Sequence, residues 1–154
     1  MASKSTISYV TEDTKWMSDQ ITGNNKDLIA RFYELADSKQ SDAGQLMATE
    51  VFSEDAALST PGGTFKGFKE ISKCRDHAWD TVTSRRHTLS KVFAGHGDKE
   101  ELAVFGTVRM TFAKRQSQDS EFVAHVKLES SGSSATQPRI SSMEVYAITS
   151  PSSA

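Results

Sequence analysis

The chain has 154 residues, of which 36% are hydrophobic and 25% are charged, and its formal net charge at pH 7 is -2. A chain of this length is expected to form one domain whose core needs no disulfide or structural metal. The balance of 18 basic and 20 acidic residues gives no general attraction to nucleic acid or to an anionic membrane. The single cysteine, Cys74, excludes an internal disulfide and favours a reducing compartment.

No apolar run approaches the roughly 18 residues of a membrane span. The first six residues lead into no signal-peptide core. We therefore expect a cytoplasmic protein that binds neither membrane nor nucleic acid.

Residues 1–23 are expected to form an N-terminal arm with a short helix, for which Thr11 is a suitable cap. This helix would present Trp16, Met17 and Ile21 to the domain. After the break at 23–25, an apolar stripe at helical spacing predicts a helix that ends near 37–39, and a second short helical piece follows at 43–49. The stripe consists of Leu28, Ile29, Phe32, Leu35 and Ala36.

Residues 52–60 are typical of a short strand that Pro61-Gly62-Gly63 stops, and 64–66 can pair back across that turn. A helix is predicted over 67–82. Arg75 falls in the middle of its apolar stripe, where an unpaired charge would be costly. Arg75 must therefore pair with a carboxylate, such as Asp55 or Glu144, or face a polar cavity.

Alternating residues predict strands over 85–94, 100–114, 122–129 and 140–148. Gly106 lies on the apolar face of the second of these, where it would let the strand bend or let another group approach closely. The order of elements indicates an α+β fold with helices covering one face of a curved antiparallel sheet. We expect one domain over 24–149 and a disordered tail over 150–154.

Four stretches of the sequence resemble the nuclear transport factor 2-like superfamily, and in particular fungal SnoaL-like polyketide cyclases, meroterpenoid isomerases and scytalone dehydratase. They are Phe32-Tyr33-Glu34-Leu35-Ala36-Asp37, Phe52-Ser53-Glu54-Asp55-Ala56, the segment from Gly67 to Arg75, and Arg85-x-His87 before the strand from Glu100. The resemblance covers roughly residues 24 to 148 and implies a cone: a curved sheet wrapped around about three helices and enclosing a pocket. It also implies a homodimer and enzymes that use neither metal nor organic cofactor, although many members are not enzymes.

In the resemblance to the dehydratase, His87 and Asp37 take the places of a catalytic histidine and aspartate. The second catalytic histidine falls at Gly106, and the two tyrosines that hold water fall at Ala36 and Thr60. Thr60 is also the place of the aspartate base of a ketosteroid isomerase. Dehydration by the known set of residues and steroid-type isomerisation are therefore both disfavoured.

The sequence suggests an isomerase or cyclase that acts on an apolar polyketide or terpenoid-like intermediate of fungal secondary metabolism. In this hypothesis His87 moves the proton, Arg75 stabilises an enolate-like oxyanion or binds a carboxylate, and Tyr33 orients a carbonyl. The alternative is a non-catalytic module that binds a ligand or dimerises. A half-buried histidine bonded to a backbone carbonyl is the ordinary explanation of His87, and packing is the ordinary explanation of Tyr33.

Further pocket-lining candidates are an acid at the end of the first helix, two large aromatic residues, and an acid and a phenol on the last strand. These are Asp37, Phe32, Trp79, Glu144 and Tyr146. A helix-end cap is the ordinary explanation of the first, and core packing that of the two aromatic residues; the face of the last strand is left open. The sequence contains no metal-ligand spacing and no glycine-rich phosphate loop.

Overall fold

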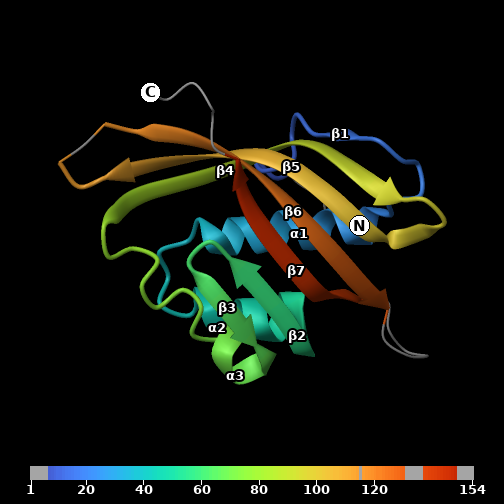
Figure 1. The fold of residues 1–154 in the computed structure, drawn as a ribbon, viewed down its shortest axis with the longest axis horizontal. Helices are drawn as coiled ribbons and strands as arrows, with labels where there is room; N and C mark the ends of the chain where they lie inside the picture. The colour runs from blue at the N-terminus through green and yellow to red at the C-terminus, as the bar shows by residue number, and fades with distance from the viewer. Residues whose placement is uncertain (1–6, 115, 131–136, 149–154) are drawn as a thin grey trace, which may run out of the picture.

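One curved sheet dominates the computed structural model, which describes residues 7–114, 116–130 and 137–148. The elements in chain order are β1 (Lys15–Trp16), α1 (Gly23–Ala36), α2 (Ala43–Leu46), the π-helical turn η1 (Met47–Val51), β2 (Phe52–Thr60), β3 (Gly63–Lys66), α3 (Gly67–Ile71), β4 (Val82–Gly95), β5 (Asp98–Phe112), β6 (Gln118–Ser130) and β7 (Pro138–Ile148). The strands lie in the order β1, β4, β5, β6, β7, β2, β3, and α1 lies against the sheet (Figure 1). The expected α+β cone is confirmed.

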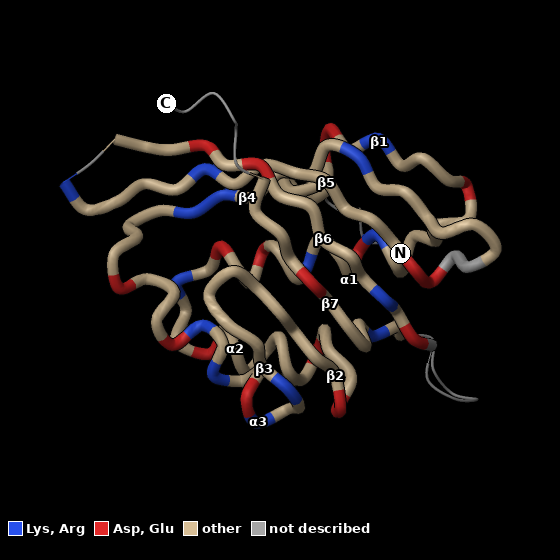
Figure 2. The backbone as a smooth tube through the Cα atoms, viewed as in Figure 1, with Lys and Arg blue, Asp and Glu red and all other residues tan. Residues whose placement is uncertain are grey.

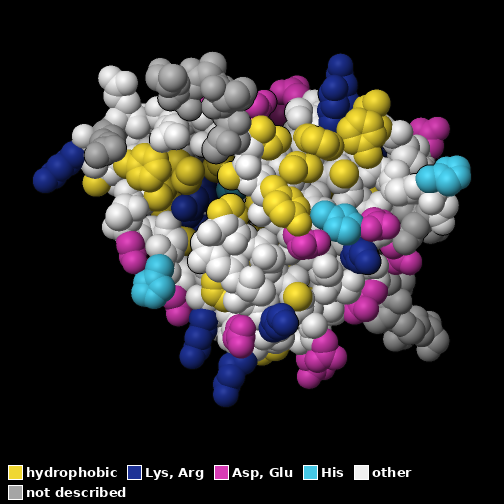
Figure 3. All heavy atoms as spheres, viewed as in Figure 1, with side chains coloured by type: hydrophobic (Ala, Val, Ile, Leu, Met, Phe, Trp, Pro, Cys, Tyr) yellow, Lys and Arg dark blue, Asp and Glu magenta, His cyan; other side chains and the backbone are white. Residues whose placement is uncertain are grey.

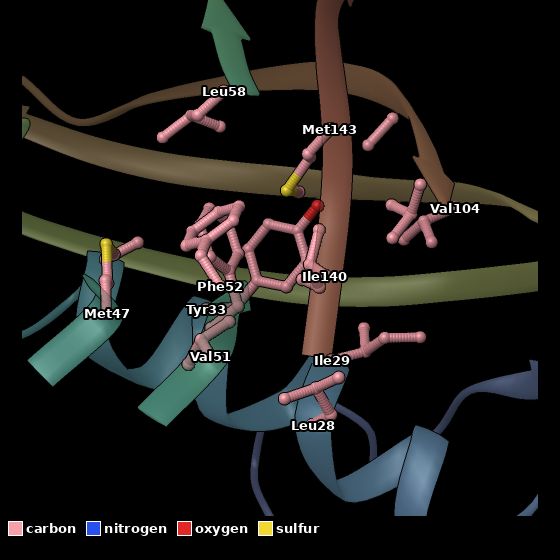
Figure 4. Packing of buried hydrophobic residues seen from close by; sticks show 14 of the residues in the cluster. Leu28, Ile29, Tyr33, Met47, Val51, Phe52, Leu58, Val104, Ile140 and Met143 are labelled. Atoms are coloured by element: carbon pink, nitrogen blue, oxygen red, sulfur yellow. The ribbon is translucent and has the colours of Figure 1, made fainter. Parts of the chain in front are cut away.

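The core lies between the apolar face of α1 and the inner face of the sheet (Figure 4). Thr22 caps α1, since its hydroxyl accepts a hydrogen bond from the backbone N–H of Asn25 at 3.2 Å. All five residues of the predicted helical stripe are buried. Burial of each large aliphatic or aromatic side chain stabilises the fold by about 1.5–3 kcal/mol, so this face of α1 anchors the helix to the sheet.

Strands β4 to β7 form a continuous antiparallel meander, and β2 joins it by pairing in parallel with β7. Every second residue of β5 from Leu102 to Val108 points inward and is buried. One of these inward positions is Gly106, which has no side chain. A Cβ atom on Gly106 would lie 2.6 Å from the carbonyl oxygen of Thr88 and 2.7 Å from Cζ of Phe122. The expected close approach is confirmed, because the Phe122 ring occupies the space that any larger residue would need.

The helix predicted over 67–82 is wrong in its extent, because α3 ends at Ile71 and a series of tight turns follows. These turns are closed by backbone hydrogen bonds between residues three apart, such as Cys74 N–H to Ile71 O and Ala78 N–H to Arg75 O. The oxygen Oγ of Ser72 donates to the Lys69 carbonyl at 2.7 Å, a local bond that competes with regular helix.

The N-terminal arm also differs from the expectation. Residues 7–22 contain turns and β1, which pairs in parallel with β4, but no helix. Ile21 is buried as expected, whereas Met17 is 51% exposed. The tail at 150–154 lies outside the described residues. None of the helices in the described part of the chain is long and apolar enough to cross a membrane.

Candidate active site

Asp37 and His87 form a buried pair at the C-terminal end of α1. Asp37 Oδ1 lies 2.5 Å from His87 Nδ1, and Asp37 Oδ2 accepts hydrogen bonds from His87 N–H at 2.8 Å and from the Tyr9 hydroxyl at 2.7 Å. The side chains of His87 and Asp37 are 14% and 6% exposed. Three donors thus compensate the burial of this carboxylate, and they fix the histidine by both its ring and its backbone.

The His87 ring lies on the inner face of β4, between two aromatic rings. The ring centroid of Tyr33 lies 4.9 Å away and that of Phe122 lies 5.5 Å away. Asp37 occupies Nδ1, and no described residue makes a hydrogen bond to Nε2. A carboxylate at Nδ1 holds the proton there, which leaves Nε2 as the basic nitrogen.

The residues on either side of Asp37 hold two more side chains of the site. Arg75 Nη2 donates to the carbonyl of Ala36 at 2.5 Å, and Trp79 Nε1 donates to the carbonyl of Ser38 at 3.1 Å. Carbonyl groups at the end of a helix lack intrahelical partners, and a cation there is favoured by the helix dipole. The short turns after α3 bring Arg75 and Trp79 to this helix end.

Arg75 therefore makes neither of the ion pairs expected for it. Asp55 is exposed on β2, and Glu144 binds His125 on the other side of the sheet. Burial and the nearby charge of Arg85 lower the pKa of Arg75 to about 10. Because this value still lies well above neutral pH, Arg75 carries its positive charge there.

Tyr33 is almost completely buried, at 2% exposure. Its hydroxyl has no hydrogen-bond partner among the described residues, and it points toward Met143 on β7 (Figure 4). Burial and the negative charge of Asp37 raise the pKa of the Tyr33 phenol, so the group stays protonated. The structure thus places Tyr33 beneath His87 as a packing support, with its hydroxyl directed into the core.

A cavity of about 290 Å³ borders the site, and its lining includes Arg75, Trp79 and Lys39. Figure 3 shows a hollow near the C-terminal end of α1 with Lys or Arg side chains recessed in it and hydrophobic side chains on its rim. Arg75 is thus beside a cavity as expected, but His87 is not among the residues that line this one.

Three expected pocket residues lie elsewhere. Phe32 is packed in the core against Phe52, with ring centroids 5.7 Å apart. Glu144 and Tyr146 lie on the outer face of β7, where the Tyr146 hydroxyl donates to Glu144 at 3.0 Å and Glu144 binds His125. The assignment of these two residues to the pocket is therefore corrected.

Sequence reasoning missed two residues of the site, Tyr9 and Arg85. Arg85 precedes His87 by two positions on β4, so the alternation of the strand could have placed both on one face. Tyr9 gave no such signal, because its contact with Asp37 spans 28 positions of the sequence. No group of three or more potential metal ligands occurs among the described residues.

Comparisons with known proteins identify the fold. No protein-family model matches the sequence, and the comparison with curated proteins finds no match. Among solved structures, the chain is similar to hexachlorocyclohexane dehydrochlorinase LinA-type3 from Novosphingobium barchaimii LL02, with a TM-score of 0.63 and 16% identity over 79% of this chain and 82% of that one.

Two further solved structures share this architecture. One is a putative scytalone dehydratase from Novosphingobium aromaticivorans DSM 12444, with a TM-score of 0.58 and 13% identity over 80% of this chain and 81% of that one. The other is nuclear transport factor 2 from Cryptosporidium parvum, with a TM-score of 0.62 and 13% identity over 85% and 97%. Likeness at such low identity shows the fold and not the activity. The chain therefore has the nuclear transport factor 2-like fold that its sequence resemblance predicted.

Proposed function

We propose that the protein is a cofactor-independent enzyme that moves a proton within an apolar substrate, as an isomerase or cyclase does. The observation that carries the proposal is the Asp37–His87 pair, in which the carboxylate binds Nδ1 and the backbone N–H while no described residue bonds to Nε2. The family resemblance adds the substrate class, a polyketide or terpenoid-like intermediate of fungal secondary metabolism.

In the proposed reaction, Nε2 of His87 removes a proton from a carbon next to a carbonyl group. The electron pair of the C–H bond moves toward the carbonyl oxygen, and the charge of Arg75 stabilises the resulting enolate. His87 then returns the proton at the far carbon of a conjugated enolate in an isomerisation. In a cyclisation the enolate carbon instead attacks a second carbonyl group, and His87 gives its proton to the alkoxide oxygen that this attack forms. Asp37 stabilises the imidazolium between the two steps through its hydrogen bond with Nδ1.

The names of two solved neighbours are compatible with this chemistry. A dehydrochlorinase and a dehydratase carry out eliminations, which also require removal of a proton from carbon. The same base could therefore serve a lyase. Proton removal by His87 is common to all these reactions, and the substrate decides how the enolate reacts next.

A non-catalytic binding module is the second candidate. It is favoured by the structural partners that Arg75 and Asp37 already have, because a helix-end cap and a tether for the N-terminal arm would explain both residues. Nuclear transport factor 2 itself shares the fold.

Deuterium exchange separates the two candidates. The protein is incubated in D₂O with small ketones that carry weakly acidic C–H bonds, such as 2-tetralone, and proton loss is followed by NMR. We expect the wild type to accelerate exchange over buffer and His87→Gln to lower that acceleration at least 100-fold, with His125→Gln as the matched control. Equal exchange by wild type and His87→Gln would favour the binding module.

A further inference from the structure

Two arginine side chains lie near the C-terminal end of α1. Arg75 reaches it from the turns after α3 and is bonded to Ala36, while Arg85 reaches it from the inner face of β4. Cζ of Arg85 lies 4.9 Å from the ring centroid of Trp79, which is itself bonded to the carbonyl of Ser38. The charge of Arg85 helps to lower the pKa of Arg75, as expected for two cations that lie close together.

Neither arginine has a carboxylate partner among the described residues. Asp37 acts electrostatically on both, but its oxygens already accept hydrogen bonds from His87 and Tyr9. Nε of Arg75 and Nη1 of Arg85 are buried and have no hydrogen-bond partner in the part of the chain that the structure describes. Each unsatisfied buried donor costs about 1–3 kcal/mol, and more when it belongs to a charged group. Structural packing alone does not account for two such donors side by side.

The surroundings add positive charge. The ammonium group of Lys39 lies 5.4 Å from the ring centroid of Trp79, and Lys39 lines the 290 Å³ cavity together with Arg75. Lys39 and Arg85 therefore lie over one indole ring, and Arg75 lines the same cavity as Lys39 and Trp79, together with the acid Asp76. Elsewhere acidic and basic residues are interspersed along the described chain (Figure 2), so this group is a local excess and not part of a broad basic face.

We infer that the substrate of the proposed enzyme is an apolar organic acid whose carboxylate binds to the guanidinium group of Arg85, which leaves Arg75 for the enolate oxygen. The planar fork of a guanidinium matches the two oxygens of a carboxylate, and Nη1 of Arg85 is a buried donor without a hydrogen-bond partner among the described residues. The site is apolar on the side of Arg85, because the Trp79 ring and the sulfur of Met110, 3.9 Å from Arg85 Nη2, lie next to this arginine. This apolar side favours an organic acid over inorganic phosphate.

The position of the arginines also restricts where the substrate reacts. Arg85 and His87 are two residues apart on the same face of β4, and such residues lie about 6.5–7 Å apart along a strand. A carboxylate on Arg85 therefore places carbon atoms a few bonds away next to His87. Since the role of His87 rests on the proposed function, the inference names a keto acid or a similar acid with an acidic C–H bond near the carboxylate.

Calorimetric binding of matched acids and amides tests the inference. The probes are benzoate, cinnamate and 2-naphthoate, each paired with its uncharged amide, at pH 7.5 and constant ionic strength. We expect at least one acid to bind the wild type at least 10-fold more tightly than its amide. Arg85→Gln is expected to abolish that preference, Arg85→Lys to restore part of it, and Arg109→Gln, an exposed arginine on β5, to leave it unchanged. Thermal melting of each variant shows whether it is folded.

The inference is overturned if no acid binds better than its amide, if Arg85→Gln keeps the preference, or if inorganic phosphate competes as well as the organic acids. Deuterium exchange, measured on the wild type and on His87→Gln, keeps these failures distinct from failure of the proposed function. A lost acid preference with intact deuterium exchange removes the carboxylate site and leaves the enzyme proposal standing. An acid preference in a protein without exchange activity leaves an acid-binding module and overturns the catalytic proposal.

Discussion

Two histidines of this chain bind carboxylates at the same distance, yet on opposite faces of the sheet. His87 Nδ1 lies 2.5 Å from Asp37 on the inner face, and His125 Nε2 lies 2.5 Å from Glu101 on the outer face. The inner pair is 14% and 6% exposed, whereas both members of the outer pair are 38% exposed. A second carboxylate, Glu144, lies 3.3 Å from the other ring nitrogen of His125.

The number of carboxylates and their burial distinguish a base from a surface ion pair. Each ring nitrogen of His125 is hydrogen-bonded to a carboxylate, so neither nitrogen is free for chemistry. The hydrogen bond with Glu101, and to a smaller extent that with Glu144, raises the pKa of His125. His87 bonds to Asp37 through Nδ1, and no described residue bonds to its Nε2. Distance alone would have made the two sites equivalent.

The largest effect is expected from breaking the inner pair. Asp37→Asn removes the charge that binds His87 and Tyr9, and we expect the free energy of unfolding to fall by about 3 kcal/mol, measured by urea denaturation. A low-field proton resonance of His87 Nδ1–H should disappear in the same variant. The matched change on the outer face, Glu101→Gln, is expected to cost less than about 1 kcal/mol. Equal losses in the two variants would contradict the distinction drawn between the faces.

A smaller effect is expected from crowding the inner histidine. Gly106→Ala places a methyl group against Thr88 and the Phe122 ring, which itself packs on His87. We expect a loss of about 1–3 kcal/mol in thermal or urea unfolding, together with a shifted His87 resonance. Gly23→Ala is the control, since nothing lies within 4 Å of its added Cβ. Equal stability of the two variants would show that the sheet relaxes without cost at Gly106.

Removal of the unpaired hydroxyl next to the inner histidine is expected to be neutral or slightly favourable. Tyr33→Phe deletes a buried polar group that has no partner, so the free energy of unfolding should stay the same or rise by up to about 1 kcal/mol. Deuterium exchange should change less than twofold. A 100-fold fall in exchange at unchanged stability would instead make Tyr33 the group that orients a carbonyl, as the sequence suggested.

The smallest effect is expected from the outer histidine, and it depends on pH. In the folded protein the pKa of His125 is raised above its ordinary value of 6.5. The stabilising contribution of His125 is therefore complete below pH 6.5 and disappears as the pH rises through the raised pKa. His125→Gln should therefore lower the melting temperature slightly at pH 5.5 and not at pH 8.5. Because the group is substantially exposed, the free energy lost should stay within about 0.5 kcal/mol. A loss that grows with pH would reverse the assigned sign.

Much of the candidate site could be named from the sequence, although its contacts could not. Asp37 and His87 were both identified by resemblance, but 50 positions separate them and no periodicity joins them. Arg75 was recognised as a cation among apolar residues, and both carboxylates considered for it were wrong. Its partner is the carbonyl of Ala36, and a backbone carbonyl is present at every position, so the pattern of side chains cannot reveal which one is used.

The sequence by itself determined α1 and the long strands, because each depends on local spacing. For Gly106 it left a bend and a close approach open, and the tertiary contacts with Thr88 and Phe122 decided for the close approach. Only the tertiary structure decided where α3 ends and which face of β7 carries Glu144. Ile140 and Met143 are three positions apart on β7, yet both are 1% exposed, because the register with β6 shifts between Lys127 and Leu128. Such a shift reverses the alternation of side chains along a strand, and it arises from pairing with a neighbour that the strand's own residues do not specify.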